Sequence, residues 1–402
     1  MPAGPWSRLR SGLALERNVA AMFAAFLVLG MGEELWVRFV PKYLELLGAS
    51  AFVVAAYGTL RELLDALYPY PGGWLADRLG RRRALELFAL VSAGGYLLFL
   101  AAPGWSWILA GTVLVMAWSS LTLPAIFGVL GDSLPAGRRA TGFGMQSILK
   151  RVPIILAPPL GGLLIAWLGF RSGIRTGLAI TIGLAFLGIW ILRRAWVEPP
   201  RPAATDGESL GSLWRAMDPG LKRLLAADIL ARWAEGIPKV FIVLFVMDVL
   251  GAGAARFGWL TSVQMIAATL VYIPVAKMSD RMDRKPFVLV TFAFFALFPL
   301  ILAVASGLAG LVAAFVVGGL RETGEPARKA MILDLAAAHA RGRSVGLYYL
   351  IRGLTVFPAS LVGGWLWSLD PRWPLYAAFA VGVAACLVHA VWGPRDVRQA
   401  AV

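Results

Sequence analysis

Residues 73–83 read GWLADRLGRRR and lie between two long apolar runs. A tight basic segment in this setting is typical of a cytoplasmic loop that joins two membrane helices. A related segment, AKMSDRMDRK, occupies residues 276–285. Asp77 and Asp280 take matching places in the two segments, 203 positions apart. The repeat predicts a chain built from two related halves.

The composition is that of a membrane protein. The chain has 402 residues, of which 59% are hydrophobic and 15% are charged. A soluble domain carries about 25% charged residues, and a mean hydropathy of +0.73 indicates lipid as the main solvent. One cysteine and two histidines exclude a disulfide framework and a thiolate metal site. We therefore expect no cofactor, no metal and no enzymatic activity.

Twelve apolar runs are long enough to cross a bilayer, which takes about 20 helical residues. We call them spans 1 to 12, and they cover residues 19–47, 50–76, 83–101, 105–131, 141–168, 172–193, 224–249, 255–279, 286–306, 308–336, 342–368 and 373–392. The expected fold is an all-α polytopic membrane protein. Two six-helix halves, residues 1–193 and 223–402, would be joined by a cytoplasmic linker at 194–222.

Lysine and arginine gather in alternate loops. With the N-terminus inside, 23 of the 38 lie in inner segments or within four residues of them, and 4 lie in or within four residues of outer loops, while the rest lie deeper within spans. The positive-inside rule therefore predicts that both termini are cytoplasmic. The net charge of +15 is then a topology signal. We expect a monomer in the inner or plasma membrane of the cell, with lipid around it and no nucleic-acid partner.

The repeat extends beyond the basic loops. Gly48 matches Gly251 at an offset of 203, and the pair Gly161-Gly162 returns as Gly363-Gly364 at an offset of 202. Two parallel six-helix halves are one of the transporter repeat architectures. In that architecture the solute site is expected at the interface between the halves.

The segment at 73–83 resembles the loop motif of the major facilitator superfamily, in which Gly, Leu, Ala, Asp, Arg and Gly precede a basic run. The matching residues are Gly73, Leu75, Ala76, Asp77, Arg78, Gly80, Arg81 and Arg82. The second copy departs from the motif, with Ala276 and Asp283 at the two glycine positions. The resemblance covers about residues 15–395, and it implies the fold of that family and transport by alternating access.

The drug antiporters of that family carry Gly-x-x-x-Gly-Pro-x-x-Gly-Gly in the fifth helix. This sequence keeps the last three residues of the pattern, Pro158, Gly161 and Gly162. It has Pro153 and Ala157 in place of the first two glycines. The resemblance to the antiporter subclass is therefore partial.

The resemblance also implies a cytoplasmic gate made by charges at the inner ends of the helices. Its members are Asp77, Arg81, Asp132, Asp280, Arg284 and Asp334. A carboxylate near a helix N-terminus is stabilised by only about 0.3–1 kcal/mol, so such a contact can break in each transport cycle. The alternative is that these charges only set the topology.

Charged residues also occur within the spans, where they are costly and usually face a cavity. The candidates for a solute and proton pathway are Glu33, Glu34, Arg38, Arg61, Asp65, Arg232, Glu235, Arg321, Glu322, Glu325 and Arg328. Spans 3, 6, 9 and 12 have no charge near their middles. The resemblance implies that these four spans face lipid while spans 1, 4, 7 and 10 line the cavity.

Two interpretations of the charges remain open. Several lie three or four residues apart, as Glu34 and Arg38 do, so they can be static ion pairs that neutralise one another. Alternatively, some exchange for solute or proton, because burial favours the neutral form of a carboxyl group. On that reading, glutamates couple protons and arginines hold an anionic group. Span 10 is the most heavily charged, so Arg321, Glu322 and Glu325 are the first candidates.

The leading hypothesis is a secondary active transporter of a small polar or charged solute, coupled to protons and working by alternating access. The alternative is a proton-driven multidrug efflux antiporter, although an apolar drug pocket does not need so many central charges. A membrane enzyme would need a localised nucleophile, metal or acid/base cluster, and this sequence shows no His/Cys cluster, nucleotide loop or soluble domain. A sensor would be expected to carry an added cytoplasmic domain, for which the linker is short.

Overall fold

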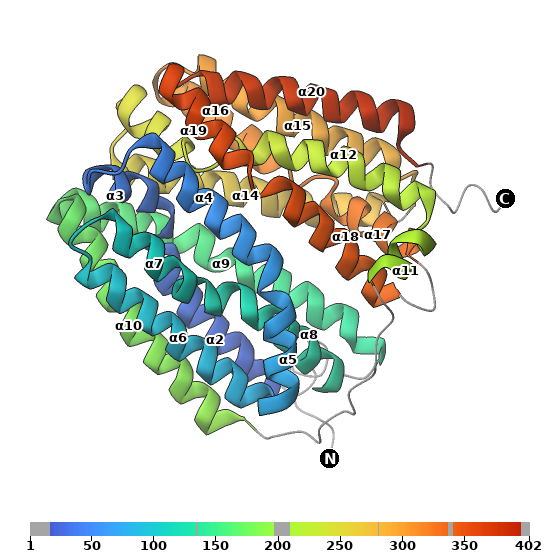
Figure 1. The fold of residues 1–402 in the computed structure, drawn as a ribbon, viewed down its shortest axis with the longest axis horizontal. Helices are drawn as coiled ribbons and strands as arrows, with labels where there is room; N and C mark the ends of the chain where they lie inside the picture. Colours follow the sequence, from blue (N-terminus) through green and yellow to red (C-terminus); the bar gives the residue numbers. More distant parts are fainter. Residues whose placement is uncertain (1–16, 134–135, 197–209, 280, 337–340, 395–402) are drawn as a thin grey trace. The chain divides into compact units, whose positions relative to one another are not determined.

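The computed structural model describes residues 17–133, 136–196, 210–279, 281–336 and 341–394. These residues form helices and connecting turns, with no strand among them, so the predicted all-α class is confirmed. Figure 1 labels the helices in chain order. Before the linker they are α2 (Arg17–Glu34), α3 (Val40–Leu46), α4 (Ala51–Leu67), α5 (Pro69–Leu79), α6 (Arg81–Ala101), α7 (Trp105–Met116), α8 (Thr122–Ser133), α9 (Ala136–Leu168) and α10 (Phe170–Ala195).

The second series begins within the expected linker, where a short helix forms. Its members are α11 (Leu210–Ala216), α12 (Pro219–Gly236), α13 (Ile242–Leu244), α14 (Ala254–Ser279), α15 (Lys285–Val304), α16 (Gly307–Leu320), α17 (Glu325–Leu335), α18 (Arg341–Val356), α19 (Ala359–Leu369) and α20 (Trp373–Trp392). Every expected span therefore coincides with one helix or with a broken helix.

Nine helical segments of the described chain are long and apolar enough to cross a membrane. They coincide with spans 1, 3, 4, 5, 6, 8, 9, 11 and 12. The other three, spans 2, 7 and 10, are interrupted helices that carry several charges. The charged residues lower the mean hydropathy of these spans, which hold most of the candidate pathway residues.

The first and fourth spans of each half are irregular near their middles. Span 1 changes from α2 to α3 through a 3₁₀ turn, and span 7 breaks after Gly236. Span 4 contains a π-helical stretch at Ala117–Leu121, and span 10 is interrupted between α16 and α17. Pro41, Pro238 and Pro326 lie at three of the breaks, where the missing N–H removes a helical hydrogen bond.

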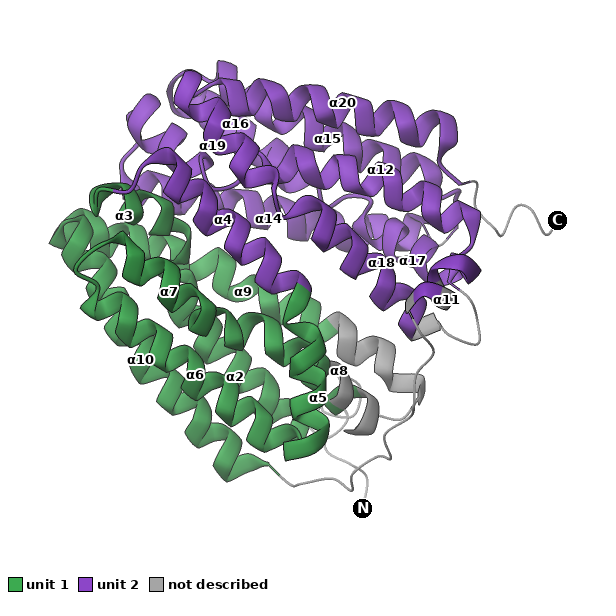
Figure 2. Cartoon of the chain, viewed as in Figure 1, with its two compact units in different colours: residues 1–48, 67–205 green, residues 49–66, 206–402 purple. Residues whose placement is uncertain are grey.

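The chain forms two compact units, which Figure 2 shows in different colours. Unit 1 comprises residues 1–48 and 67–205, and unit 2 comprises residues 49–66 and 206–402. Helix α4, which we expected in the first half, therefore groups with unit 2. Its Gly58 and Ala55 approach Ser360 and Gly364 of α19 closely.

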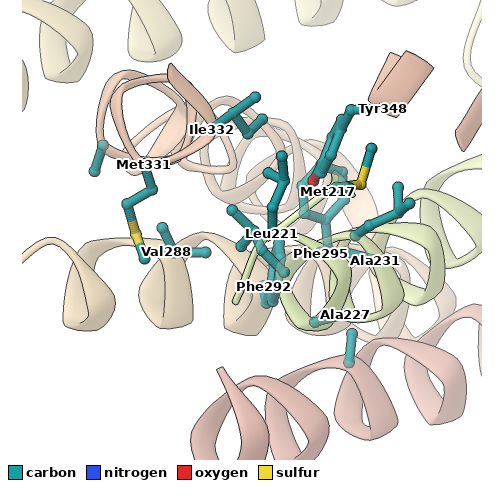
Figure 3. Packing of buried hydrophobic residues seen from close by; sticks show 14 of the residues in the cluster. Met217, Leu221, Ala227, Ala231, Val288, Phe292, Phe295, Met331, Ile332 and Tyr348 are labelled. Atoms are coloured by element: carbon teal, nitrogen blue, oxygen red, sulfur yellow. The ribbon is translucent and has the colours of Figure 1, made fainter. Parts of the chain in front are cut away.

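The core of unit 2 is a cluster of apolar side chains from α12, α15, α17 and α18 (Figure 3). Phe292 and Phe295 of α15 belong to it, together with Leu221 of α12 and Tyr348 of α18. In unit 1, α2 packs tightly on α10, since Gly32 of α2 leaves no room for a Cβ beside Thr181. Both cores include helices that also carry candidate pathway residues.

The repeated glycines take equivalent positions in the two units. Gly48 and Gly251 both adopt a positive φ, of 83° and 67°, a region that favours glycine. Gly161 of α9 lies against the carbonyl of Leu35 in the break of span 1. Gly363 of α19 lies in the same way against the carbonyl of Ile237, in the break of span 7. Gly161 and Gly363 thus allow the backbones of α9 and α19 to approach the broken spans.

Candidate solute and proton pathway

Unit 2 contains a chain of ion pairs in which positive and negative groups alternate. We call it the charge chain, and its order is Arg321, Glu235, Arg232, Glu325, Arg328, Asp228 and Arg352. The members come from α12, from span 10 and from α18. Five of the seven were predicted as pathway residues from the spans alone: Arg232, Glu235, Arg321, Glu325 and Arg328. The structure thus brings residues from three spans into one network.

The centre of the charge chain is the most enclosed part. Arg328 donates from Nη1 to Asp228 Oδ2 at 2.7 Å and from Nη2 to Glu325 Oε2 at 2.6 Å. The side chains of Arg328 and Asp228 are only 2% and 1% exposed. Glu325 also accepts from Arg232. Such charges are stable in a dry interior only because each one meets opposite charge and hydrogen-bonding groups.

The two ends of the charge chain are held less tightly. Arg321 Nη1 lies 3.8 Å from Glu235 Oε1, beyond hydrogen-bond length, whereas Glu235 accepts from Arg232 at 2.8 Å. Arg321 uses its Nε to donate to the Gly318 carbonyl at 2.8 Å. At the other end, Arg352 donates to Asp228 at 3.2 Å and is 22% exposed.

Aromatic side chains of the core support the arginines. The guanidinium of Arg321 lies 5.2 Å from the ring centre of Phe295 and 4.6 Å from that of Phe298. Arg232 also lies over Phe295, at 5.1 Å. A cation over an aromatic face is attracted by the ring quadrupole, and more so where water is excluded. Tyr348 donates its hydroxyl to Asp228 at 2.9 Å.

Spacing along a single helix predicts the wrong neighbours for charged residues in spans 7 and 10. In a continuous helix the spacing of Asp228, Arg232, Glu235 and Lys239 would place them on one face, but α12 ends at Gly236. Lys239 lies in the following turn and donates to Glu62 of α4. In span 10 the break separates Arg321 from Glu325, so Arg321 pairs with Glu235 of another helix.

Unit 1 presents a smaller polar set around the break of span 1. Glu34 and Arg38 form the expected ion pair, at 2.8 Å. The neighbouring Glu33 accepts from Tyr96 of α6, a fully buried tyrosine. Trp36 donates to the Thr181 hydroxyl of α10 at 3.0 Å. The irregular turn is thereby tied to two other helices.

The remaining pathway candidates lie at separate places. Arg61 of α4 donates to Tyr57 at 3.3 Å, one turn earlier in the same helix. Asp65 is exposed one turn later. Glu322 lies half-buried in the interrupted turn of span 10, next to Arg321. It adds a fourth carboxylate beside Arg321, at one end of the charge chain.

Only part of the expected gate falls within the described residues. Arg284 donates to Asp334 across α15 and α17, and the Arg284 side chain is 9% exposed. Asp77 is exposed near the end of α5, and Arg81 begins α6. Asp132 lies in α8, but its side chain is outside the described residues, as is the whole of Asp280.

Three members of the polar network were missing from the predicted pathway: Asp228, Tyr348 and Arg352. Asp228 and Arg352 carried the same signal as the candidates, a charge within spans 7 and 11, whereas Tyr348 can be read as a packing aromatic. Asp228 is 100 positions from Arg328 and 124 from Arg352. Spacing rules within one helix detect no contact over such distances.

A family model supplies the classification that the fold suggests. The model described as the Major Facilitator Superfamily matches residues 19–227 and 224–402. This chain belongs to the Major Facilitator Superfamily. As a superfamily member it is a membrane-spanning transporter of small molecules rather than an enzyme.

Relatives of this superfamily member are distant but match along most of their length. An uncharacterized MFS-type transporter of Methanocaldococcus jannaschii is 22% identical over 377 residues, which cover 89% of this chain and 90% of that protein. The multidrug resistance protein MdtH of Klebsiella pneumoniae subsp. pneumoniae is 25% identical over 387 residues, covering 91% and 90%. The solved structure of a mutant of the nucleoside transporter NupG has a TM-score of 0.76 at 12% identity, covering 94% of this chain and 99% of that one. That likeness shows the fold alone.

Proposed function

We propose that this protein is a secondary active transporter of a small polar or charged solute, coupled to protons. The observation that carries the proposal is the charge chain, a series of four arginines and three carboxylates that is buried at its centre and partly exposed at its ends. Charges at bilayer depth are costly and are usually retained for a function. A network of exchangeable pairs suits a solute that itself carries charge.

The balance of charge favours an anionic or zwitterionic solute. The arginines outnumber the carboxylates of the charge chain by one, and Glu322 beside Arg321 makes the numbers equal. A site for lipophilic cations would need an excess of carboxylates. A balanced network instead offers guanidinium groups for an acid group and carboxylates for an amine.

Arg321 is the arginine best suited to bind the acid group. Its ion pair with Glu235 is long, while the faces of Phe295 and Phe298 hold the guanidinium in place. A carboxylate of the solute would replace Glu235 as its partner and gain a bidentate, charge-assisted contact. Glu235 would keep Arg232, to which it is bound at 2.8 Å.

Proton coupling follows from the same exchange. A carboxylate in a dry site stays ionised through its positive neighbours, and loss of one neighbour favours proton uptake. Glu235 would lose Arg321 when solute binds, and Glu325 would lose one of Arg232 and Arg328 if the chain rearranges. Solute binding and protonation would then bias the same conformational equilibrium.

Proteoliposomes with an internal pH dye test this function. A panel of amino acids, small peptides, carboxylic acids and nucleosides is first screened for thermal stabilisation of the purified protein, and stabilising solutes are then assayed for transport. We expect a charged or zwitterionic solute to drive a pH change. Glu235→Gln or Glu325→Gln should lower the proton-to-solute ratio, while Glu86→Gln in the surface pair with Arg193 should leave it unchanged. An unchanged ratio in both pathway variants would reduce the charge chain to a static support.

Multidrug efflux is the second candidate, and one observation favours it. The relatives that match along most of their length include proteins named multidrug resistance protein MdtH. The same proteoliposomes separate the candidates when ethidium is offered as a lipophilic cation. Proton-driven movement of ethidium, together with no stabilisation by any acid or zwitterion, would support efflux and contradict the charged-solute proposal.

The cytoplasmic gate remains part of the proposed cycle. Asp77, Arg81 and Asp132 would close it in the first half, and Asp280, Arg284 and Asp334 in the second. The contact between Arg284 and Asp334 supports this role for the second half, since it joins α15 to α17. Exposed or half-exposed ion pairs contribute about 0–1 kcal/mol, which suits a contact that forms and breaks.

A further inference from the structure

Two hydroxyl groups lie on corresponding helices of the two units. Ser92 is on α6, which is span 3, and Thr291 is on α15, which is span 9 (Figure 1). Both residues are fully buried, at 0% exposure. These two spans have no charges near their middles, so the hydroxyls are unusual there and invite a reason for their presence.

Ser92 completes the hydrogen bonding of the irregular stretch in span 4. Its hydroxyl accepts from the Trp118 N–H at 2.7 Å and donates to the Val115 carbonyl at 2.9 Å. Trp118 lies in the π-helical stretch Ala117–Leu121, where the ordinary helical ladder is shifted. Ser92 therefore bonds the backbone just before and within the π-helical stretch from a neighbouring helix.

Thr291 does the same for span 10. Its hydroxyl oxygen accepts from the Gly324 N–H, in the turn that separates α16 from α17. The backbone of α15 comes close enough here that a Cβ on Gly324 would collide with the Phe287 carbonyl. Gly324 is also the residue directly before Glu325 and lies three positions after Arg321.

We infer that Ser92 and Thr291 are positioning residues for transport. Each accepts a hydrogen bond from a backbone N–H at the interruption of a neighbouring helix and so stabilises the interruption. In a bilayer no water replaces this acceptor. Thr291 thereby fixes the turn from Arg321 to Gly324, which directs the Arg321 side chain to Glu235 and starts α17 at Glu325. This role holds whichever solute the protein carries.

Each hydroxyl is matched by a buried threonine with a purely local bond. Thr112 of α7 is 1% exposed and donates to the Ile108 carbonyl four residues earlier. Thr261 of α14 is 3% exposed and donates to the Phe257 carbonyl, also four residues earlier. Replacing either by Val leaves the helical N–H partner of that carbonyl in place, so these variants control for the loss of a buried hydroxyl.

Hydrogen–deuterium exchange of the full-length protein in lipid nanodiscs tests the inference without a solute. Loss of the partner of a buried N–H should speed its exchange by about tenfold or more. We expect Thr291→Val to speed exchange in peptides covering 320–326, while Thr291→Ser keeps the parental rate. Ser92→Ala should speed exchange in peptides covering 116–122 and leave 320–326 unchanged. Thr112→Val and Thr261→Val should alter neither segment.

The segments in which exchange becomes faster distinguish a positioning role from general stabilisation. Faster exchange along α20 as well would indicate global loosening and overturn the inference, as would parental exchange at 320–326 in Thr291→Val. If Thr291→Val does not fold, the Ser92→Ala peptides decide alone. In transport assays, Thr291→Val should change the proton-to-solute ratio or the KM, and Thr291→Ser should restore it.

Discussion

At the scale of single residues, burial separates charges that hold the structure from charges that are free to change partner. Arg328 is 2% exposed and is bound on both sides by carboxylates at 2.6–2.7 Å. Arg321 is 13% exposed and has one long ion pair. The same residue type, in the same span, therefore has two different physical settings.

The first prediction concerns Arg328. Arg328→Met should lower the unfolding midpoint strongly, because removing one partner of a buried ion pair costs about 3–5 kcal/mol. Arg193→Met, which removes a pair whose arginine is 62% exposed, should cost about 1 kcal/mol or less. Thermal unfolding of the two purified variants, followed by tryptophan fluorescence, measures the difference. Equal midpoints would mean that water reaches the centre of the charge chain.

The sequence was sufficient to find most of these residues but not their partners. Hydropathy and charge identify Arg232, Glu235 and Glu325 because charged groups stand out in apolar spans. The contact between Arg328 and Asp228 joins residues 100 positions apart. Such a contact depends on how two helices pack, and a single sequence contains no periodicity that reports it.

At the scale of helices, the breaks in spans 1 and 7 depend on close approach by another backbone. Gly161 and Gly363 provide it, each next to a carbonyl that lies in the break. A Cβ at either position would collide with that carbonyl. Each contact lies within one unit, so Gly161 and Gly363 are sites of close packing between helices.

The second prediction concerns these glycines. Gly363→Ala should lower the unfolding midpoint and slow transport, because α19 can no longer lie against Ile237. Gly346→Ala, in α18 where nothing lies within 4 Å, is the matched control. It should be neutral or stabilising by about 0.5–1 kcal/mol, since alanine favours the helix. A control that destabilises as much as Gly363→Ala would show that backbone approach is not the cause.

Hydropathy predicts the positions of the helices, whereas the sequence predicts the breaks within them only in part. Pro41 and Pro326 indicate two of them, and both stand at the start of a new helix. Pro158, by contrast, lies inside the continuous α9. The π-helical stretch of span 4 has no proline of its own and depends on Ser92 from another helix. Tertiary hydrogen bonds thus decide where a helix is interrupted.

At the scale of the whole molecule, the loops determine orientation. The excess of lysine and arginine in alternate loops supports the proposal that both termini and the linker are cytoplasmic, in the inner or plasma membrane. The compact units do not follow the expected halves at one place, since α4 groups with unit 2. Hydropathy could not foresee this, because it locates spans without reporting which spans pack together.

The third prediction concerns this orientation. Single cysteines at Ser209 and at Gly307, in a Cys386→Ala background, are treated with a membrane-impermeant thiol reagent on intact cells. We expect labelling at Gly307, which begins α16, and none at Ser209 in the linker. Permeabilised cells serve as the control in which both positions react. The reverse pattern in intact cells would invert the topology.

The alternation of charge has a consequence for the response to membrane voltage. Moving one elementary charge across 100 mV changes the free energy by about 2.3 kcal/mol. In the charge chain and Glu322 the arginines and carboxylates are equal in number, so these groups would carry almost no net charge if they moved together through the field. This network would then add little electrical work to that of moving the solute and its protons. A comparison of solute flux under opposite imposed potentials would therefore measure the net charge that crosses the membrane with each solute.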